Sequence, residues 1–269
     1  MHIHILDQHI ETNSIVHRLD PRVKLVSALV FILACALTPD GAWLAFAALG
    51  VLLLVLIIIS DLSIMTLMKR SIVALPFALA AVTVMFTIPG ETLATIPLPF
   101  SAGKYQLSIS DAGLVRFVTI MLKSWLSVLM ALLLSATTTF PDILRAMRGI
   151  GVPRVLVSVI AFMYRYIFVL GDEALRLMRA REARTATGSD GRRSGGNIIW
   201  RAKVVGGMAG SLFVRSLSRS ERVYQAMVSR GYTGEMLWLE KPRLQGWHLA
   251  VGGLFIAILA AIEALAWLS

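Results

Sequence analysis

Two arginine-rich segments in the second half of the sequence carry the residue types that bind acidic groups of a protein partner. They read RAREAR at 179–184 and VSRGYTG at 228–234. A guanidinium at a helix end can bind carboxylates or carbonyl oxygens through two parallel hydrogen bonds, and a small neighbouring residue lets the helix end enter a groove. The segments therefore predict two docking motifs, each with a small residue before the arginine: Ala180, Arg181 and Glu182, then Ser229, Arg230 and Gly231.

The first motif allows more than one register, because Arg179 and Arg184 compete with Arg181 for the docking role. Lys123 is a candidate of another kind. It lies near the middle of an apolar stretch, where a charged side chain is by default a functional candidate. Arg116, on the same helix face, can extend outward to the membrane surface. We expect Lys123 to face a neighbouring helix or a partner subunit instead of lipid.

Metal binding and catalysis find less support in the sequence. His2, His4 and His9 have the side chains for a transition-metal site, but a tail that binds no metal is the favoured reading. Cys35 is the single cysteine, so it forms no intrachain disulfide and is expected to be a small buried residue. The sequence contains no Walker A loop, no G-x-S-x-G elbow and no H-E-x-x-H pair. We therefore predict no catalytic residues, no bound cofactor and no metal ligands.

Composition indicates an integral membrane protein. Hydrophobic residues make up 57% of the 269 residues, more than one soluble core buries. A formal charge of +10 would suggest nucleic acid in a soluble domain, but in a membrane protein it more often reflects basic cytoplasmic loops. We therefore expect the lipid bilayer as a partner and no nucleic acid.

Five stretches approach the length of about 20 apolar residues that a spanning helix needs. They begin at Val23, Gly41, Ser71, Gly113 and Gly246, and Pro76 is expected to kink the third. Basic residues precede the first stretch and follow the second, which predicts a multi-pass protein with a cytoplasmic N-terminus. The segment 89–110 has Lys104 as its one basic residue and is expected to be an external loop.

The basic excess is concentrated in one block. Residues 145–243 hold 18 of the 26 Lys and Arg but 7 of the 16 Asp and Glu, a net charge of +11. Apolar residues recur there at helical spacing, which predicts a short helix from Pro141, a long helix from Pro153 to about Arg184, and another from about Asn197 to Arg230. Gly231 would end the last helix in a left-handed conformation.

The predicted fold is all-α, with about five transmembrane helices and a cytoplasmic module of long amphipathic helices. Its parts are a leader at 1–22, four transmembrane helices at 23–137, cytoplasmic or interfacial amphipathic helices at 140–243 and a last transmembrane helix at 246–268. In the leader, Asp20 is expected to cap the first transmembrane helix, with Pro21 at its first position. Arg22 and Lys24 are expected to extend toward lipid phosphates.

Three motifs in order, VHRLDPRVKL at 16–25, RAREAR and VSRGYTG, resemble those of the transmembrane coupling (T) component of energy-coupling-factor transporters, in particular the cobalt type. Glu182 departs from the family pattern, in which glycine is more usual. The resemblance implies a non-enzymatic subunit of the bacterial inner membrane. Its arginine motifs would bind two cytoplasmic ABC-type ATPase subunits, which use ATP and magnesium, and its membrane helices would hold a substrate-binding S component. Cobalt, for cobalamin biosynthesis, is the favoured cargo, with nickel and vitamins as alternatives.

Three other readings stay open at this stage. The amphipathic helices can lie in the lipid headgroup layer without a protein partner. A self-contained permease would be expected to show inverted repeats, and none is clear in the sequence. A membrane-bound lipid-metabolising enzyme would use the basic block to bind headgroups, although no residues suggest its catalytic site.

Overall fold

The computed structural model describes residues 14–72, 75–87, 92–97, 106–184, 197–234 and 245–268. These residues fall into two compact units. The membrane unit comprises the described residues of 14–150 and 245–268, and the two-helix unit comprises those of 151–234. Apart from one short hairpin, every regular element in the described ranges is a helix, so the predicted all-α class is confirmed.

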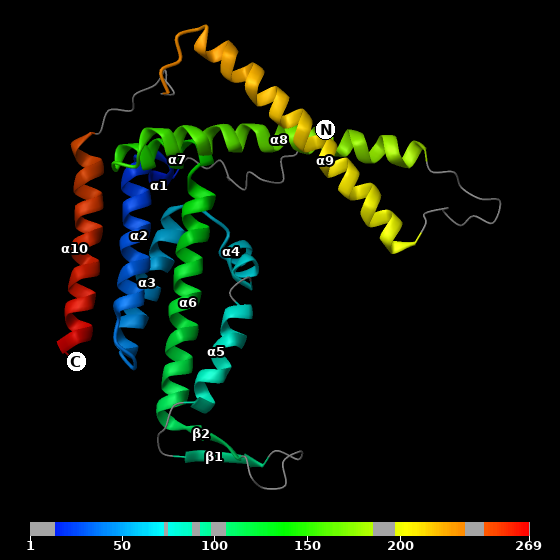
Figure 1. Cartoon of the computed structure of the whole chain (residues 1–269). Coiled ribbons are helices and arrows are strands. Elements are labelled where there is room, and N and C mark those ends of the chain that lie inside the picture. Colours follow the sequence, from blue (N-terminus) through cyan, green and yellow to red (C-terminus); the bar gives the residue numbers. More distant parts are fainter. Residues whose placement is uncertain are drawn as a thin grey trace. The chain divides into compact units, whose positions relative to one another are not determined.

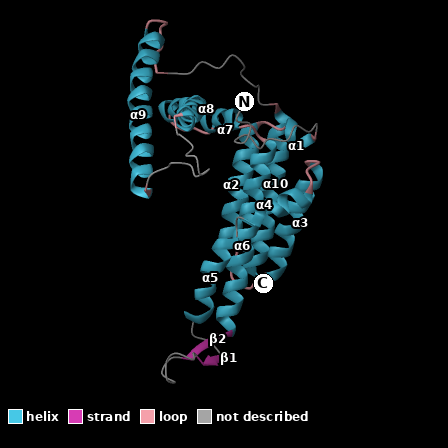
Figure 2. Ribbon diagram, turned by 90° about the vertical axis from the view of Figure 1, so that its right-hand side faces the viewer, coloured by secondary structure: helices cyan, strands magenta, loops and turns pink. Residues whose placement is uncertain are grey.

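Four long helices run side by side in the membrane unit, as Figure 1 and Figure 2 show. They are α2 (Pro21–Leu37), α3 (Trp43–Ile59), α6 (Asp111–Thr137) and α10 (Gly246–Leu268). Each begins within two residues of a predicted stretch. Shorter helices join them: α1 (Ile15–Arg18), α4 (Ile64–Ser71), α5 (Leu75–Thr87) and α7 (Phe140–Gly149).

Two predictions for the third apolar stretch, its start and its kink, were wrong. The third stretch does not begin as a helix at Ser71, which is the last residue of α4; α5 begins at Leu75. Pro76 therefore lies in the first turn of α5, where its missing N–H costs no helical hydrogen bond, and it does not kink a continuous helix. The expected loop at 89–110 contains a hairpin, in which β1 (Thr92–Pro97) pairs antiparallel with β2 (Gln106–Ser110).

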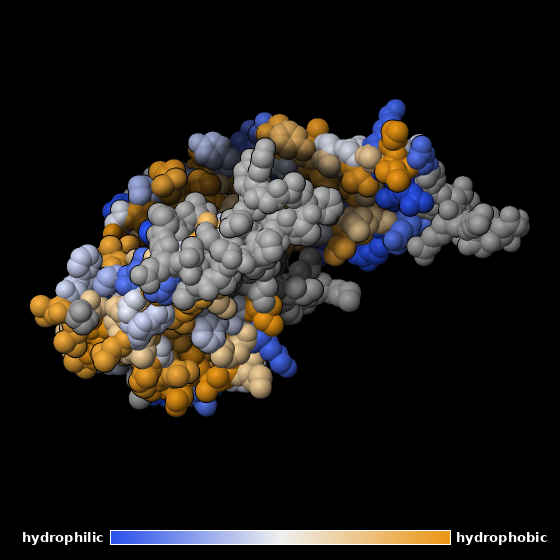
Figure 3. Space-filling model, turned by 90° about the horizontal axis from the view of Figure 1, so that it is seen from below, coloured by the Kyte–Doolittle hydropathy of each residue, from blue (hydrophilic) through white to orange (hydrophobic). Residues whose placement is uncertain are grey.

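Apolar side chains fill the interior of the membrane unit and also cover its outer surface. Phe31, Leu49, Leu53 and Leu259 are almost fully buried where α2, α3 and α10 meet. Large apolar side chains also point outward, and Figure 3 shows them in orange; they include Leu33, Leu44, Val51, Ile58 and Leu254. Helices that are apolar on both faces are typical of proteins surrounded by lipid.

The leader residues connect several helix ends. The Asp20 carboxylate accepts a hydrogen bond from Arg22 N–H and caps α2, with Pro21 at its first position, as predicted. Lys24 does not extend toward lipid phosphates. It is buried, and its Nζ donates to the backbone oxygens of His17 at 3.1 Å and Thr137 at 3.0 Å. An ammonium at the end of α6 satisfies a carbonyl that has no partner within the helix.

The two-helix unit contains α8 (Arg154–Ala183) and α9 (Ile198–Val228), which cross each other in Figure 1. Their bounds agree with the predicted long helices to within two residues. Three described helices are long and apolar enough to cross a membrane, namely α6, α8 and α10. Length and composition therefore allow α8 to span lipid, although the sequence pattern placed it in the amphipathic block.

Gly113 supplies a test of packing between α5 and α6. A Cβ atom at this position would lie 2.6 Å from the Met85 backbone oxygen. We expect Gly113→Ala to destabilise the membrane unit by about 1–3 kcal/mol, because the backbone must shift to relieve the overlap. Thermal unfolding of the full chain in nanodiscs measures the effect. Gly50→Ala is the matched control, since a Cβ there meets nothing within 4 Å; equal melting temperatures for the two variants would contradict the prediction.

Candidate functional site

The two arginine motifs lie at the C-terminal ends of the crossed helices. Arg181 is half-buried in the last turn of α8, and Arg230 is exposed just beyond α9. Ala180, Glu182 and Ser229 are exposed. Figure 1 shows the C-terminal ends of α8 and α9 at opposite ends of the crossed pair. The fold therefore separates the two motifs.

A Schellman motif positions Arg230. Gly231 has φ +82°, as its predicted left-handed role requires. The N–H of Gly231 donates to Val228 O at 2.9 Å, and the N–H of Tyr232 donates to Met227 O at 3.0 Å. The Tyr232 ring meets the Phe162 ring edge-on, with centroids 6.5 Å apart. Tyr232 thus holds the end of α9 against α8, and Arg230 remains exposed.

The secondary candidates in the first motif differ in their local contacts. Arg179 donates its Nε to Leu175 O at 3.3 Å, which directs its side chain back along α8. Arg184 is the C-cap residue of α8, and its N–H donates to Arg181 O at 3.1 Å. Arg181 and Arg184 therefore lie closer to the free end of the helix than Arg179 does.

An acidic residue that sequence reasoning missed joins α8 to α9. The Glu173 carboxylate lies 2.9 Å from Arg215 Nη1, 3.2 Å from Arg176 Nη2 and 3.9 Å from Arg219 Nη2. The available signal was the scarcity of acidic residues in a block of net charge +11. Each such residue has several arginines that compete to pair with it.

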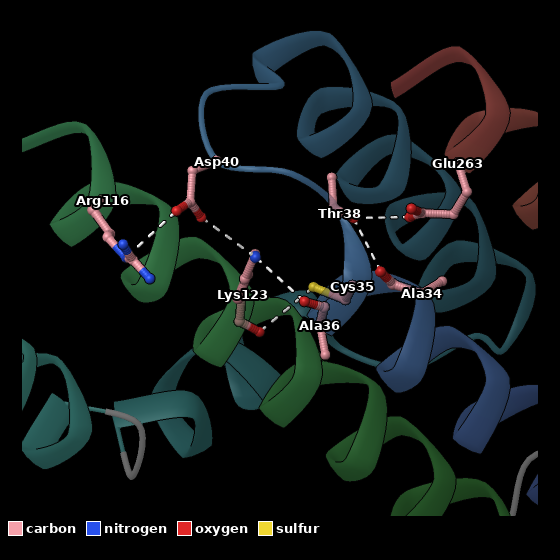
Figure 4. Close-up of polar contacts among 8 residues, drawn as sticks. All are labelled: Ala34, Cys35, Ala36, Thr38, Asp40, Arg116, Lys123 and Glu263. Atoms are coloured by element: carbon pink, nitrogen blue, oxygen red, sulfur yellow. Dashed lines mark hydrogen bonds and ion pairs between the residues drawn. The ribbon is translucent and has the colours of Figure 1, made fainter. Parts of the chain in front are cut away.

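Lys123 belongs to a polar cluster at the hairpin end of the membrane unit, drawn in Figure 4. Its Nζ donates to Ala36 O at 3.3 Å and lies 3.6 Å from Asp40 Oδ1. Arg116 Nε lies 3.5 Å from the other oxygen of Asp40. Lys123 thus faces the C-terminal end of α2, as expected for contact with a neighbouring helix. The cation stabilises this helix end, where the helix dipole is negative.

The same end of α2 holds two further contacts (Figure 4). Thr38 Oγ1 lies 2.8 Å from Glu263 Oε1 of α10, and the buried Cys35 thiol donates to Lys123 O at 3.6 Å. The sequence analysis did not single out Thr38, Asp40 or Glu263. Asp40 lies in a short turn and Glu263 in a long apolar stretch, so their proximity depends on how α2, α6 and α10 pack.

No group of three or more His, Cys, Asp or Glu side chains suited to a metal ion occurs in the described part of the chain. The histidine candidates His2, His4 and His9 lie outside the described residues. The geometry that the structure does show is that of helix ends and ion pairs, which hold helices together.

Comparisons with known proteins identify the family of this chain. A family described as "CbiQ: Cobalt transport protein" matches residues 12–238. An energy-coupling factor transporter transmembrane protein EcfT of Bacillus selenitireducens is 30% identical over 86% of this chain and 84% of its own length. The EcfT proteins of Thermosediminibacter oceani and Listeria innocua are 29% and 27% identical, covering 85% and 98% of this chain and 84% and 97% of their own lengths.

Fold and comparisons together define a membrane component of a transporter, not an enzyme. More specifically, the chain belongs to the CbiQ/EcfT family, the transmembrane proteins of energy-coupling factor transporters. The family resemblance seen in the leader and the two arginine motifs is thereby confirmed.

Two substitutions in the polar cluster compare the contribution of the Lys123–Ala36 hydrogen bond to stability with that of the ion pairs of Asp40. Lys123→Met is expected to destabilise the membrane unit by about 1.5 kcal/mol or more, because the Ala36 carbonyl loses a charged donor. Asp40→Asn is expected to cost no more than about 1 kcal/mol, since Asp40 and Arg116 are 42% and 57% exposed. Thermal unfolding of both variants in nanodiscs compares these costs. If Asp40→Asn proved as destabilising as Lys123→Met, the ion pairs would matter more than the carbonyl contact.

Proposed function

We propose that this chain is the coupling subunit of an energy-coupling-factor importer of the ABC type. It would transmit ATP-driven movement from two cytoplasmic ATPase subunits to a membrane-embedded S component that binds the substrate. The observation that carries the proposal is the placement of two arginine-bearing helix ends, with Arg181 half-buried and Arg230 exposed, at opposite ends of one crossed helix pair. Two separated sites of similar chemistry suit two similar partners.

The chemistry of the motifs supports ATPase docking. Arg230 lies within a Schellman turn that ends the helix abruptly, so its guanidinium can enter a partner's groove and bind carboxylates or carbonyl oxygens. In the first motif, Arg181 and Arg184 are favoured over Arg179 because they lie closer to the C-terminal end of α8. ATP and magnesium would be bound by the partner subunits, since this sequence carries no Walker A loop.

A cytoplasmic or interfacial place for the two-helix unit is part of this proposal. Although α8 is apolar enough to span a membrane, its second half carries Glu173, which forms ion pairs with Arg176 of the same helix and with Arg215 of α9. No residue of α9 is buried, and the helix carries several exposed basic residues. Charges of this kind are costly in hydrocarbon but stable near phosphates and water.

The remaining topology follows from the same reasoning. In the bacterial inner membrane the leader end of the membrane unit would be cytoplasmic, because Arg18 and Arg22 precede the first membrane stretch, and the hairpin end would be external. Residues 23–137 and 246–268 then provide the membrane helices, and residues 140–243 provide the coupling region. The S component would bind among the exposed apolar side chains of these helices.

Cobalt is the proposed cargo. Its support is the description of the matching family as a cobalt transport protein and the resemblance of the leader and the complete coupling block to the cobalt type. In this arrangement the S component binds the metal, so His2, His4 and His9 need not contact it. Nickel ions and vitamins are the alternative cargoes.

Charge reversal of both motifs tests the coupling role. We expect Arg181→Glu combined with Arg230→Glu to abolish co-purification of the ATPase subunits from native membranes, because the partner's acidic groups would then face carboxylates. Quantitative mass spectrometry of the purified complex measures the loss. The matched control is Arg165→Glu with Arg222→Glu, which reverses exposed charges on the same two helices away from their ends.

A wild-type chain that brings down no ATPase subunit would contradict the coupling role. Transport by the purified chain alone would then favour a permease, and turnover of lipid substrates would favour an enzyme. Equal loss of ATPase in the control double variant would show that general charge, and not the helix ends, is responsible.

Cargo identity requires a separate experiment. The complex co-purified with the wild-type chain, reconstituted in proteoliposomes, is expected to accumulate cobalt ions only when ATP is supplied to its cytoplasmic side. Uptake is measured by elemental analysis, with an equal concentration of nickel ions or of a vitamin as competitor. Uptake of a vitamin without cobalt uptake would refute cobalt as the cargo and leave the coupling role intact.

A further inference from the structure

The contact between α8 and α9 is concentrated on one carboxylate. Glu173 of α8 is 17% exposed, and both of its oxygens are engaged. Oε1 accepts a hydrogen bond from Arg215 Nη1 at 2.9 Å, and Oε2 accepts one from Arg176 Nη2 at 3.2 Å and lies 3.9 Å from Arg219 Nη2. Two of the three guanidiniums belong to α9, so the Glu173 side chain links α8 to α9.

Apolar packing between these helices is incomplete. A groove of about 480 Å³ is lined by side chains of both helices, among them Phe162, Met163, Phe213 and Leu217. No residue of α9 is buried. The Phe162 ring of α8 also meets the ring of Tyr232, which follows the end of α9. The contacts at Glu173 and Phe162 therefore join the two helices, and apolar packing leaves a groove between them.

We propose that Glu173 is a positioning residue that fixes how α8 and α9 cross, and thereby sets the separation of Arg181 from Arg230. The inference deepens the proposed function, because it assigns the geometry of the two docking motifs to one residue that lies in neither of them. A helix end moves as its helix rotates about the crossing, so loss of the contact at Glu173 changes the distance between the motifs.

Electrostatics explains why a carboxylate is needed at this position. Arg176, Arg215 and Arg219 gather around Glu173, and a neutral residue there would leave three positive charges facing one another. The arginine side chains are 64%, 57% and 34% exposed, so they can move apart once the carboxylate is removed. The crossing is therefore expected to depend on salt concentration, as contacts between exposed charges do.

The first experiment measures the crossing geometry directly. Cysteines introduced at the exposed positions Ala183 and Gln225, near the ends of α8 and α9, are spin-labelled in the full chain in nanodiscs. Buried Cys35 remains, and the chain without added cysteines is the labelling control. We expect Glu173→Gln to shift and broaden the distance distribution between the labels. The Glu173→Asp variant, which keeps the charge, is expected to retain more of the wild-type distribution.

Asp172→Asn is the matched control, because it removes one negative charge from the exposed neighbouring position on the same helix. It is expected to leave the distance distribution unchanged. Circular dichroism and gel filtration establish that all variants keep their helix content and size. A Glu173→Gln distribution identical to that of the wild type, or an equal change in Asp172→Asn, would overturn the inference.

The second experiment measures the consequence for docking. Glu173→Gln is expected to lower the number of ATPase subunits that co-purify with each chain below the wild-type value, although Arg181 and Arg230 are intact. If wild type binds no ATPase while the spin-label distance still depends on Glu173, the proposed function fails and the crossing role is supported. If wild type binds ATPases and the distance does not depend on Glu173, only the present inference fails.

Discussion

The ammonium group of Lys24 lies where several helix ends of the membrane unit meet. It donates to carbonyls at the ends of α1 and α6, and the neighbouring Asp20 caps α2 and donates its N–H to His248 Nδ1 of α10 at 3.4 Å. Hydrogen bonds to charged groups contribute about 1.5–3 kcal/mol each, and a helix end left without partners in lipid costs several kcal/mol. The position of α2 against α6 and α10 depends on this junction, and the polar cluster at the other end of α2 depends in turn on that packing.

Sequence reasoning located helices well because their signals are local. Apolar length located α2, α3, α6 and α10, and a glycine in a polar sequence located the end of α9. It failed where two segments had to be placed together. Lys24 and Thr137 are 113 residues apart, and nothing in either segment shows that a lysine at a helix start will cap a different helix instead of reaching lipid.

The same limit applies to the candidate site. Arg181, Arg230 and Lys123 were found because an arginine at a helix end or a lysine in an apolar stretch is unusual by itself. Glu173, Asp40 and Glu263 were missed because each acquires its role from a partner on another helix. From the sequence alone, Glu173 has several possible arginine partners. The crossing of α8 and α9 places Arg215 and Arg219 beside it.

The charged side chains of the two units have different kinds of partner. This difference supports the proposal that the membrane unit is a packed bundle and that the two-helix unit responds to the ATPase subunits. In the membrane unit, Lys24 and Lys123 donate to backbone carbonyls at helix ends, and a cavity of about 80 Å³ beside Lys24 is lined mainly by apolar side chains. Such contacts hold helices in fixed positions. In the two-helix unit the ion pairs are largely exposed and the apolar packing is open, so less energy opposes a change of crossing angle. A subunit that transmits movement requires both properties: a packed bundle that moves as one body, and a pair of helices whose geometry responds to its partners.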